Sequence, residues 1–170
     1  CLWFIRVLFR SLQEVSVQDF RWKADTKMAN APEPDLDDLL WTIAVTRIIF
    51  GAEMNIQAPP NLSYDEYPQL VSAGLNDWGG VSPVTPDHGN PEVPWPHIDQ
   101  LRENTAACGK GLTERLAVYP SYALEPARWQ DSAMATSVIR AVDSDGFARV
   151  EEWSPGDAID APPVEYSPVK

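Results

Sequence analysis

The sequence predicts an α/β fold built on a parallel sheet. Short β-branched runs alternate with segments of helical length and 3.6-residue apolar spacing, which is the pattern of βαβ units. The polar loops follow the predicted strands, where parallel α/β folds place their functional residues. At 170 residues the chain is long enough for a domain with its own core. We therefore expect the functional side chains to gather at one edge of the sheet.

Each predicted element has a local signal. Strands are expected at residues 14–20, 54–58, 75–79 and 114–119. The first helix begins at Asp35, whose acidic neighbours suit a helix N-terminus, and ends at Gly51. The second follows a capping box at Ser63–Glu66 and ends at Gly74. A third helix is expected over residues 95–108, and the pattern weakens from residue 120 onward.

The charge balance excludes two classes of partner. Thirteen Lys and Arg against 25 Asp and Glu give a formal net charge of -12 and a sequence pI near 4.4. Such a surface repels nucleic acid and anionic lipid. No apolar run approaches the roughly 18 residues that a membrane span needs. The sequence therefore predicts a cytoplasmic protein without nucleic-acid or membrane partners.

The chain has two cysteines, Cys1 and Cys108. They are far apart and lack metal-ligand spacing, so neither a disulfide framework nor a metal site is expected. We predict a reduced pair, with Cys108 as a small buried hydrophobic residue on a helix.

The loop from Asn76 to Glu92 is the strongest candidate for a functional site. Its prolines stiffen it and its paired glycines allow close backbone approach. A rigid loop with many polar side chains is typical of a binding or catalytic segment. Its candidates are Asp77 as a base or hydroxyl ligand, Trp78 as a stacking platform or core residue, and His88 as a proton-transfer group or structural residue. Further binding candidates in the loop are Ser82, Thr85, Asn90 and Glu92.

Three amides follow the first two predicted strands. Gln18 and Gln57 can each donate and accept a hydrogen bond, so they could bind a polar ligand or satisfy loop backbone. Asn61 could bind a ligand or cap the next turn. Glu92 is expected either to pair with Arg115 or to accept a substrate proton.

Several motifs in order resemble one enzyme family. They are Gln57-Ala58-Pro59-Pro60-Asn61-Leu62, the run from Asp77 to Pro83, Asn90-Pro91-Glu92 and Pro94-Trp95-Pro96, with weaker matches at residues 13–21, 31–34 and 114–120. This series resembles the radical S-adenosylmethionine (SAM) component that closes the ring in synthesis of FO, 7,8-didemethyl-8-hydroxy-5-deazariboflavin, the chromophore of coenzyme F420.

The resemblance implies a fold and a domain organisation. The fold would be the C-terminal portion of a radical SAM (β/α) TIM-like barrel, incomplete because a whole barrel takes about 250 residues. Residues 1–11 would be a non-family or misread segment, 12–155 the barrel portion, and 156–170 a Pro-rich disordered tail. We expect an incomplete barrel to expose sheet edges and an apolar interior, both of which favour aggregation.

The resemblance also implies an activity. The parent enzyme would be a carbon–nitrogen lyase that uses SAM and a 4Fe-4S cluster, releasing ammonia on ring closure. Its substrate would be 5-amino-5-(4-hydroxybenzyl)-6-(D-ribitylimino)-5,6-dihydrouracil, supplied by a tyrosine-adduct-forming partner enzyme or fused domain. The resemblance casts Asp77 and His88 as catalytic and the other candidates as substrate or SAM ligands. It implies that Gln18 and Gln57 bind the uracil-like edge or the ribityl hydroxyls of the substrate, and that Asn61 could hold the carboxylate or ribose of SAM. Three thiolates at Cys-x3-Cys-x2-Cys spacing hold such a cluster, and this chain lacks them.

Two alternatives stay open. The chain could be an inactive partial gene product without the cluster-binding half, or a related radical SAM enzyme of menaquinone synthesis. Two residues depart from the family pattern: Asp19 stands where Asn is expected, and Gly89 where Val is expected. The first adds negative charge near the site and the second loosens the loop.

Overall fold

The computed structural model describes residues 12–63, 66–82 and 84–150. The chain divides into two compact units, residues 1–112 and 113–170. The first contains a three-stranded sheet and the candidate site, and the second contains short helices. The expected tail at residues 156–170 and the non-family segment at 1–11 lie outside the described residues.

The sheet of the first unit is parallel, as the sequence predicts. Its order is β1 (Glu14–Ser16), β2 (Asn55–Ala58) and β3 (Asp77–Trp78). In the register, Ser16 lies opposite Gln57 and Gln57 opposite Asp77. The strands are shorter than expected, since β1 ends at Ser16, β2 begins at Asn55 and β3 ends at Trp78. The described strands form an open sheet rather than a closed barrel.

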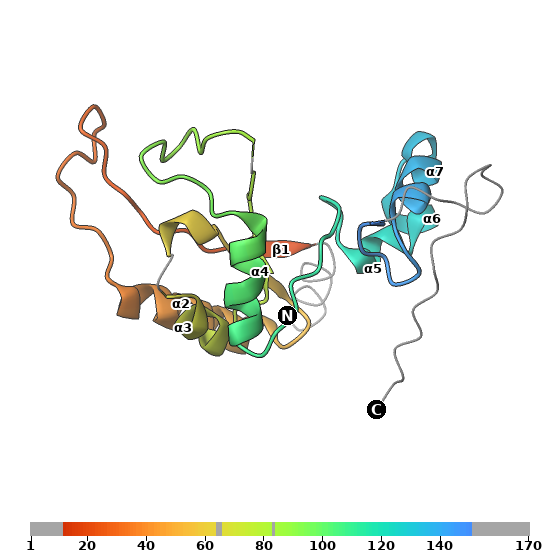
Figure 1. The fold of residues 1–170 in the computed structure, drawn as a ribbon, viewed down its shortest axis with the longest axis horizontal. Helices are drawn as coiled ribbons and strands as arrows, with labels where there is room; N and C mark the ends of the chain where they lie inside the picture. The colour runs from red at the N-terminus through yellow and green to blue at the C-terminus, as the bar shows by residue number, and fades with distance from the viewer. Residues whose placement is uncertain (1–11, 64–65, 83, 151–170) are drawn as a thin grey trace, which may run out of the picture. The chain divides into compact units, whose positions relative to one another are not determined.

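Among the described residues of this unit, three α-helices pack: α2 (Leu36–Phe50), α3 (Tyr67–Ala73) and α4 (Ile98–Ala107). Figure 1 shows α2 and α3 side by side on one side of the sheet. The expected ends of α2 are confirmed, since Asp35 accepts a hydrogen bond from the Asp38 N–H at 2.9 Å and Gly51 is the C-cap. Gly74 ends α3 in the left-handed region, at φ 118°.

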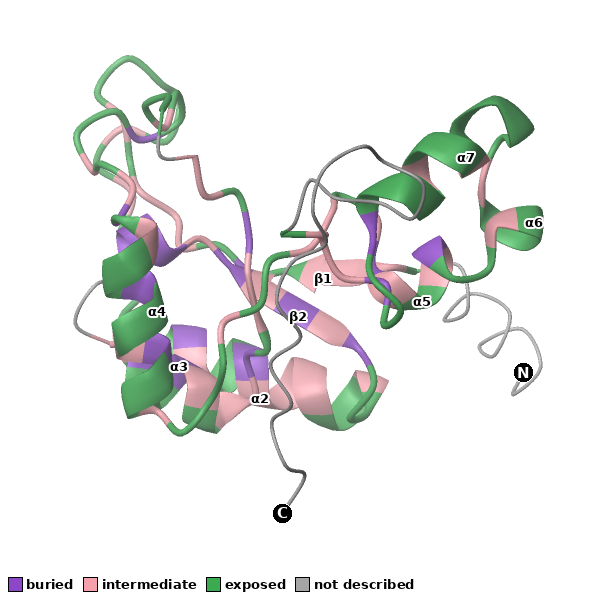
Figure 2. Cartoon of the chain, turned by 45° about the vertical axis from the view of Figure 1, so that its right-hand side comes forward, coloured by how far each residue is buried: buried purple, intermediate pink, exposed green. Residues whose placement is uncertain are grey.

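The two faces of the sheet differ in polarity. Side chains alternate along a strand, so Val15, Ile56 and Ala58 face the helices, and the core of this unit forms there. Figure 2 shows buried residues on β2 and on the helices. The opposite face carries Ser16, Gln57 and Asp77. The expected apolar interior is therefore wrong for the described strands, whose open face is polar.

Three other expectations are wrong in detail. The Ser63–Glu66 segment is no capping box: Ser63 ends a 3-10 helix, η1 (Pro60–Leu62), and Glu66 makes no side-chain cap bond at the start of α3. The helix expected from residue 95 begins at Ile98, because prolines at 94 and 96 lack the N–H that a helix interior uses. Cys108 is the half-buried C-cap of α4, and its thiol lies 3.2 Å from the Asn104 carbonyl.

The second unit lacks the strand expected at residues 114–119. Arg115 folds back instead: it donates to the Leu116 carbonyl and lies 3.9 Å from the centre of the Tyr119 ring. Pro120 then starts α5 (Pro120–Ala123), and α6 (Pro126–Trp129) and α7 (Ser132–Ala141) follow. An antiparallel bridge joins Val142 to Ala148.

Candidate functional site

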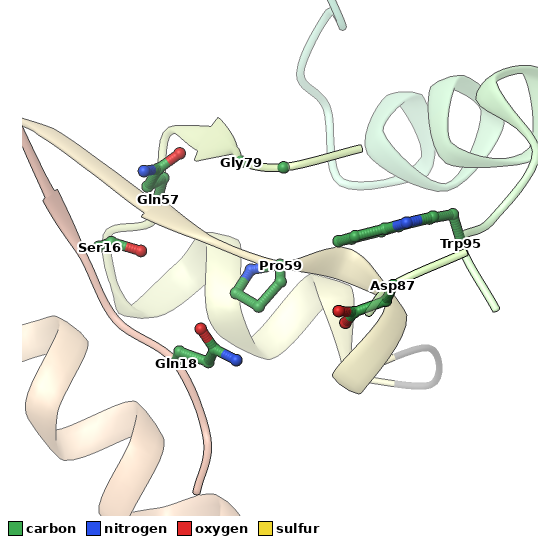
Figure 3. Close-up of a pocket in the computed structure, with 8 residues that line it drawn as sticks. Ser16, Gln18, Gln57, Pro59, Gly79, Asp87 and Trp95 are labelled. Carbon is green, nitrogen blue, oxygen red and sulfur yellow. The ribbon is translucent and has the colours of Figure 1, made fainter. Parts of the chain in front are cut away.

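A cavity of ≈ 220 Å³ opens at the carboxyl ends of the parallel strands. Figure 3 shows Ser16 and Gln18 from the β1 side, Gln57 from β2, and Trp95 and Asp87 across from them. Parallel strands end at one edge of a sheet, so residues just past each strand become neighbours. The lining residues are Ser16, Gln18, Gln57, Pro59, Gly79, Gly80, Asp87 and Trp95.

Gln18 and Gln57 both line this cavity, although they lie 39 positions apart in sequence. The Val17 N–H donates to the Gln57 carbonyl at 2.8 Å, which extends the ladder past β1 and brings Gln18 to the cavity. Neither side chain has a recorded hydrogen bond within the described residues. Both carboxamides are therefore available to a ligand.

Gly79, just after β3, leaves room for the side chain of Gln57. A methyl group at position 79 would lie 1.8 Å from Oε1 of Gln57, far inside van der Waals contact. Gly80 follows with φ 74°, a left-handed conformation that favours glycine. The paired glycines that the sequence marks for close approach thus lie against the cavity.

Asp87 is the carboxylate of the cavity, and side-chain and backbone hydrogen bonds hold it. It accepts hydrogen bonds from the Asn61 Nδ2 at 2.9 Å, the Asn90 Nδ2 at 3.2 Å and the Gly89 N–H at 2.8 Å. Burial works to raise the pKa of Asp87, but these hydrogen bonds and one from the Asn90 backbone outweigh it and hold the pKa below its ordinary value. Asp87 is thus an ionised group of defined position.

Asn61 and Asn90 act on this carboxylate rather than line the cavity. Asn61 is buried, and its amide also donates to the Val93 carbonyl at 3.1 Å, joining η1 to the loop after β3. Asn90 is buried three residues beyond Asp87. Both amides anchor the loop that carries Asp87.

Asp77 and Trp78 point to opposite sides of the sheet. Asp77 shares the polar face with Gln57, one strand away, but is not among the cavity-lining residues. Trp78 lies on the helix side, with its ring centre 4.8 Å from that of Tyr67. Its Nε1 donates to the Thr105 hydroxyl at 3.1 Å. The structure therefore places Trp78 in the packed layer, and Trp95 supplies the indole of the cavity.

The remaining loop candidates lie outside the cavity. Ser82 accepts hydrogen bonds from the Thr85 hydroxyl at 2.7 Å and the Thr85 N–H at 3.3 Å, a local turn contact. His88 is exposed. Glu92 is exposed and forms an ion pair with Lys23, whose hydrogen bond lowers the pKa of the carboxyl. Lys23 lies on the loop after β1. The expected pairing of Glu92 with Arg115, which belongs to the second unit, stays a prediction.

Asp19, the residue that replaces an expected Asn, is nearly buried. Burial raises the pKa of its carboxyl, nearby Glu66 and Glu33 add to the effect, and Arg21 at 3.6 Å opposes it. The surroundings of Asp19 therefore favour the neutral form of its carboxyl more than water does.

Sequence reasoning missed Ser16, Asp87 and Trp95 as cavity residues. Asp87 precedes Gly89 and Asn90, a spacing typical of an aspartate that bonds its own loop backbone. Trp95 stands between two prolines, which hold its backbone extended. Both signals are local, but neither tells which way the side chain points.

Within the described residues, no group of three or more His, Cys, Asp or Glu side chains could hold a metal ion. Among the same residues, no helix is long and apolar enough to cross a bilayer.

The chain resembles a series of known proteins. It is 46% identical over 144 residues to the FO synthase of Streptomyces avermitilis, covering 84% of this chain and 17% of that protein. It is 43% identical over 160 residues to the FO synthase of Streptomyces coelicolor, 94% of this chain and 18% of that protein. The 7,8-didemethyl-8-hydroxy-5-deazariboflavin synthase of Methanopyrus kandleri is 45% identical over 138 residues, 81% of this chain and 40% of that protein.

No protein-family model and no solved structure matches the chain. The chain spans about one sixth of the length of the FO synthases that it matches. At 43–49% identity over most of its residues, it belongs to the FO synthase family as a segment of such a protein.

Proposed function

We propose that this chain is the segment of an FO synthase that forms part of the substrate pocket for radical SAM ring closure. One observation carries the proposal: a chain with this degree of identity to FO synthases places a polar cavity at the carboxyl ends of its parallel strands. That edge is where parallel α/β folds bind their ligands.

The fold proposal is that residues 12–155 belong to the C-terminal portion of a radical SAM (β/α) barrel. Two features support it. The described strands are parallel with helices on one face, and their other face is polar, as suits a barrel wall that lines a substrate site. The loops after β1, β2 and β3 all contribute to the cavity.

The proposed roles follow from the contacts. Gln18 and Gln57 bind polar edges of the dihydrouracil-containing substrate, and the indole of Trp95 lies against its ring. Asp87 holds hydroxyl or N–H donors, positioned by Asn61 and Asn90. Asp77 stays our choice for a catalytic group on the polar face, and His88 for an exposed proton-transfer group. Ser82, Thr85 and Glu92 would shape the loop that bears them.

The cofactors of the proposed reaction do not have a complete site in this chain. SAM, once bound to a 4Fe-4S cluster, supplies the radical that starts ring closure. The chain has two cysteines, one fewer than the thiolates that hold such a cluster, so its residues do not fit the cluster. The described residues of this chain can bind and orient the substrate.

A segment replacement tests the proposal. Residues 12–150 would replace the matched segment of the Streptomyces coelicolor FO synthase, and FO formation and iron content would be measured. We expect a cluster-loaded chimera that forms FO. A folded, cluster-loaded chimera without FO formation would contradict the proposal and favour the inactive partial gene product.

Asp77→Asn in the same chimera tests the catalytic assignment. We expect FO formation to fall by about 100-fold or more, the scale of a lost general acid or base, with iron content unchanged. Asp25→Asn, an exposed aspartate on the loop after β1, is the control. Unchanged turnover in Asp77→Asn would remove this residue from the mechanism.

A further inference from the structure

Gly79 has no side chain at the one place where the Gln57 carboxamide needs room. A Cβ there would lie 1.8 Å from Oε1, 2.5 Å from Cδ and 3.3 Å from Cγ of Gln57. The conflict therefore extends over most of the Gln57 side chain. Any residue larger than glycine at position 79 would force this carboxamide to leave its place.

The backbone conformation at position 79 does not by itself require a glycine. Gly79 is not among the residues with positive φ, so an L-residue could adopt its conformation. Its N–H donates to the Ala58 carbonyl at 3.2 Å, a contact that alanine would keep. Gly80, by contrast, needs its left-handed conformation at φ 74°. The requirement at position 79 is thus for space beside Gln57.

The Gln57 carboxamide that occupies this space is not committed to the protein. Within the described residues, no hydrogen bond is recorded for the side chains of Gln57, Gln18 or Ser16, all of which line the cavity. Gln57 is half-buried and Gln18 and Ser16 are exposed, so all three polar groups are open to a ligand. Figure 3 shows Gln57 beside Gly79, with Trp95 on the other side of the cavity.

We propose that Gly79 is a specificity-determining residue that lets the Gln57 carboxamide lie across the end of β3, where it recognises the amide edge of a flat cyclic ligand. A carboxamide offers an N–H donor and a C=O acceptor side by side, which matches the paired C=O and N–H of a cyclic imide or lactam. The indole of Trp95 suits the flat face of such a ring. The inference rests on the proposed function for its setting, but its test does not.

The first experiment measures stability in a double-mutant cycle on the chain as given. Gly79→Ala is expected to lower the melting temperature by several degrees because it overpacks a buried site. Gln57→Ala removes the atoms that conflict, so Gly79→Ala/Gln57→Ala should recover most of that loss. Gly111→Ala is the control, since its Cβ would meet nothing within 4 Å. A double variant as unstable as Gly79→Ala would overturn the coupling.

The second experiment measures binding, with uracil as the cyclic imide and ribitol as the polyol. The side-chain amide NMR signals of Gln18 and Gln57 should shift saturably with uracil. Gly79→Ala should weaken uracil binding about tenfold, the loss of two neutral hydrogen bonds. Gly79→Ala/Gln57→Ala should lose no more uracil affinity than Gly79→Ala or Gln57→Ala alone. The inference would be overturned if these signals shifted with ribitol but not with uracil, or if they shifted with neither compound. Uracil binding that is unchanged in Gly79→Ala would also overturn it.

The chimera gives a readout that does not need the isolated chain to fold. There, Gly79→Ala should raise KM about tenfold, by the same two hydrogen bonds, with iron content unchanged. Equal KM in wild type and Gly79→Ala would contradict the inference. Uracil binding by a chain whose chimera forms no FO would leave this inference standing and overturn only the proposed function.

Discussion

At the scale of single residues, Asp87 shows how a polar loop acquires a fixed charge. Two carboxamides and backbone N–H groups converge on it, and one carboxamide comes from Asn61, 26 positions earlier. Hydrogen bonds to an ionised group are stronger than neutral ones. The carboxylate therefore stabilises the loop and presents a negative charge to the cavity.

This arrangement predicts a pH-dependent stability. Because the folded pKa of Asp87 lies below its ordinary value of 3.8, ionised Asp87 contributes stability above that value, and the contribution is lost as pH falls through the folded pKa. Asp87→Asn should cost about 1–2 kcal/mol at pH 7. Urea unfolding at pH 7 and below pH 4 measures the difference, which should shrink in acid. The prediction would be contradicted if Asp87→Asn lowered the unfolding free energy equally at both pH values. It would also be contradicted if Asp87→Asn cost no more stability than the control Asp25→Asn.

Substitution of the two tryptophans near the site should have different effects, on stability for Trp78 and on ligand binding for Trp95. Trp78 packs on Tyr67 and donates to Thr105, so Trp78→Phe should cost about 1 kcal/mol or more of unfolding free energy. Trp95 lines the cavity, so Trp95→Phe should weaken uracil binding and change stability less. Thermal unfolding and NMR titration of both variants test this. If Trp78→Phe weakened uracil binding and Trp95→Phe lowered stability instead, Trp78 rather than Trp95 would lie against the ligand.

At the scale of elements, Arg47 joins α2, α3 and β2. Its guanidinium donates to the carbonyls of Gly74 (3.0 and 2.7 Å), Gly51 (2.8 Å), Ala52 (3.0 Å) and Met54 (2.7 Å). These carbonyls lie at or after the ends of both helices and beside β2, where helix geometry leaves them without intrahelical partners. Burial lowers the pKa of Arg47. One side chain thus holds the helix layer in register with the sheet.

Arg47→Lys should therefore be a costly exchange. A single ammonium cannot reach carbonyls on several segments in the planar geometry of a guanidinium. We expect a loss of about 2–3 kcal/mol in urea unfolding, the scale of hydrogen bonds to a charged group. The control is Arg102→Lys on α4, whose exposed ion pair with Asp99 is worth little. Equal stability of the two variants would show that the carbonyls find other partners.

At the scale of the whole molecule, α2 has more apolar surface than its own unit buries. Leu39 and Ile43 are buried against the sheet, while Trp41, Ile48 and Ile49 are 68%, 81% and 61% exposed. A helix that is apolar on several sides is typical of a buried element. Exposed apolar surface of this kind favours association.

We predict that the isolated chain associates in solution. Trp41→Lys/Ile48→Lys should reduce the associated fraction without lowering the melting temperature, since both side chains point into solvent. Sedimentation velocity over a range of concentrations measures this, with Asp37→Lys on the same helix as the charge control. A chain that stays monomeric at high concentration would contradict the prediction.

What the sequence by itself determined is local or periodic. Asp35 and Gly51 mark the ends of α2 because capping depends on a few neighbouring residues. The alternation of strand and helix predicts the parallel sheet, and with it the meeting of Gln18 and Gln57 at one edge. The resemblance to the ring-closing family came from motifs in order, and the relatives confirm it.

What only the tertiary structure decided depends on direction and on distant partners. Trp78 and Asp77 are adjacent in sequence, yet strand alternation sends one to the helix layer and the other to the polar face. Asp87 binds Asn61 and Glu92 binds Lys23 because loops after different strands come together at one edge. The strand expected at residues 114–119 needed a pairing partner, which no local pattern can supply.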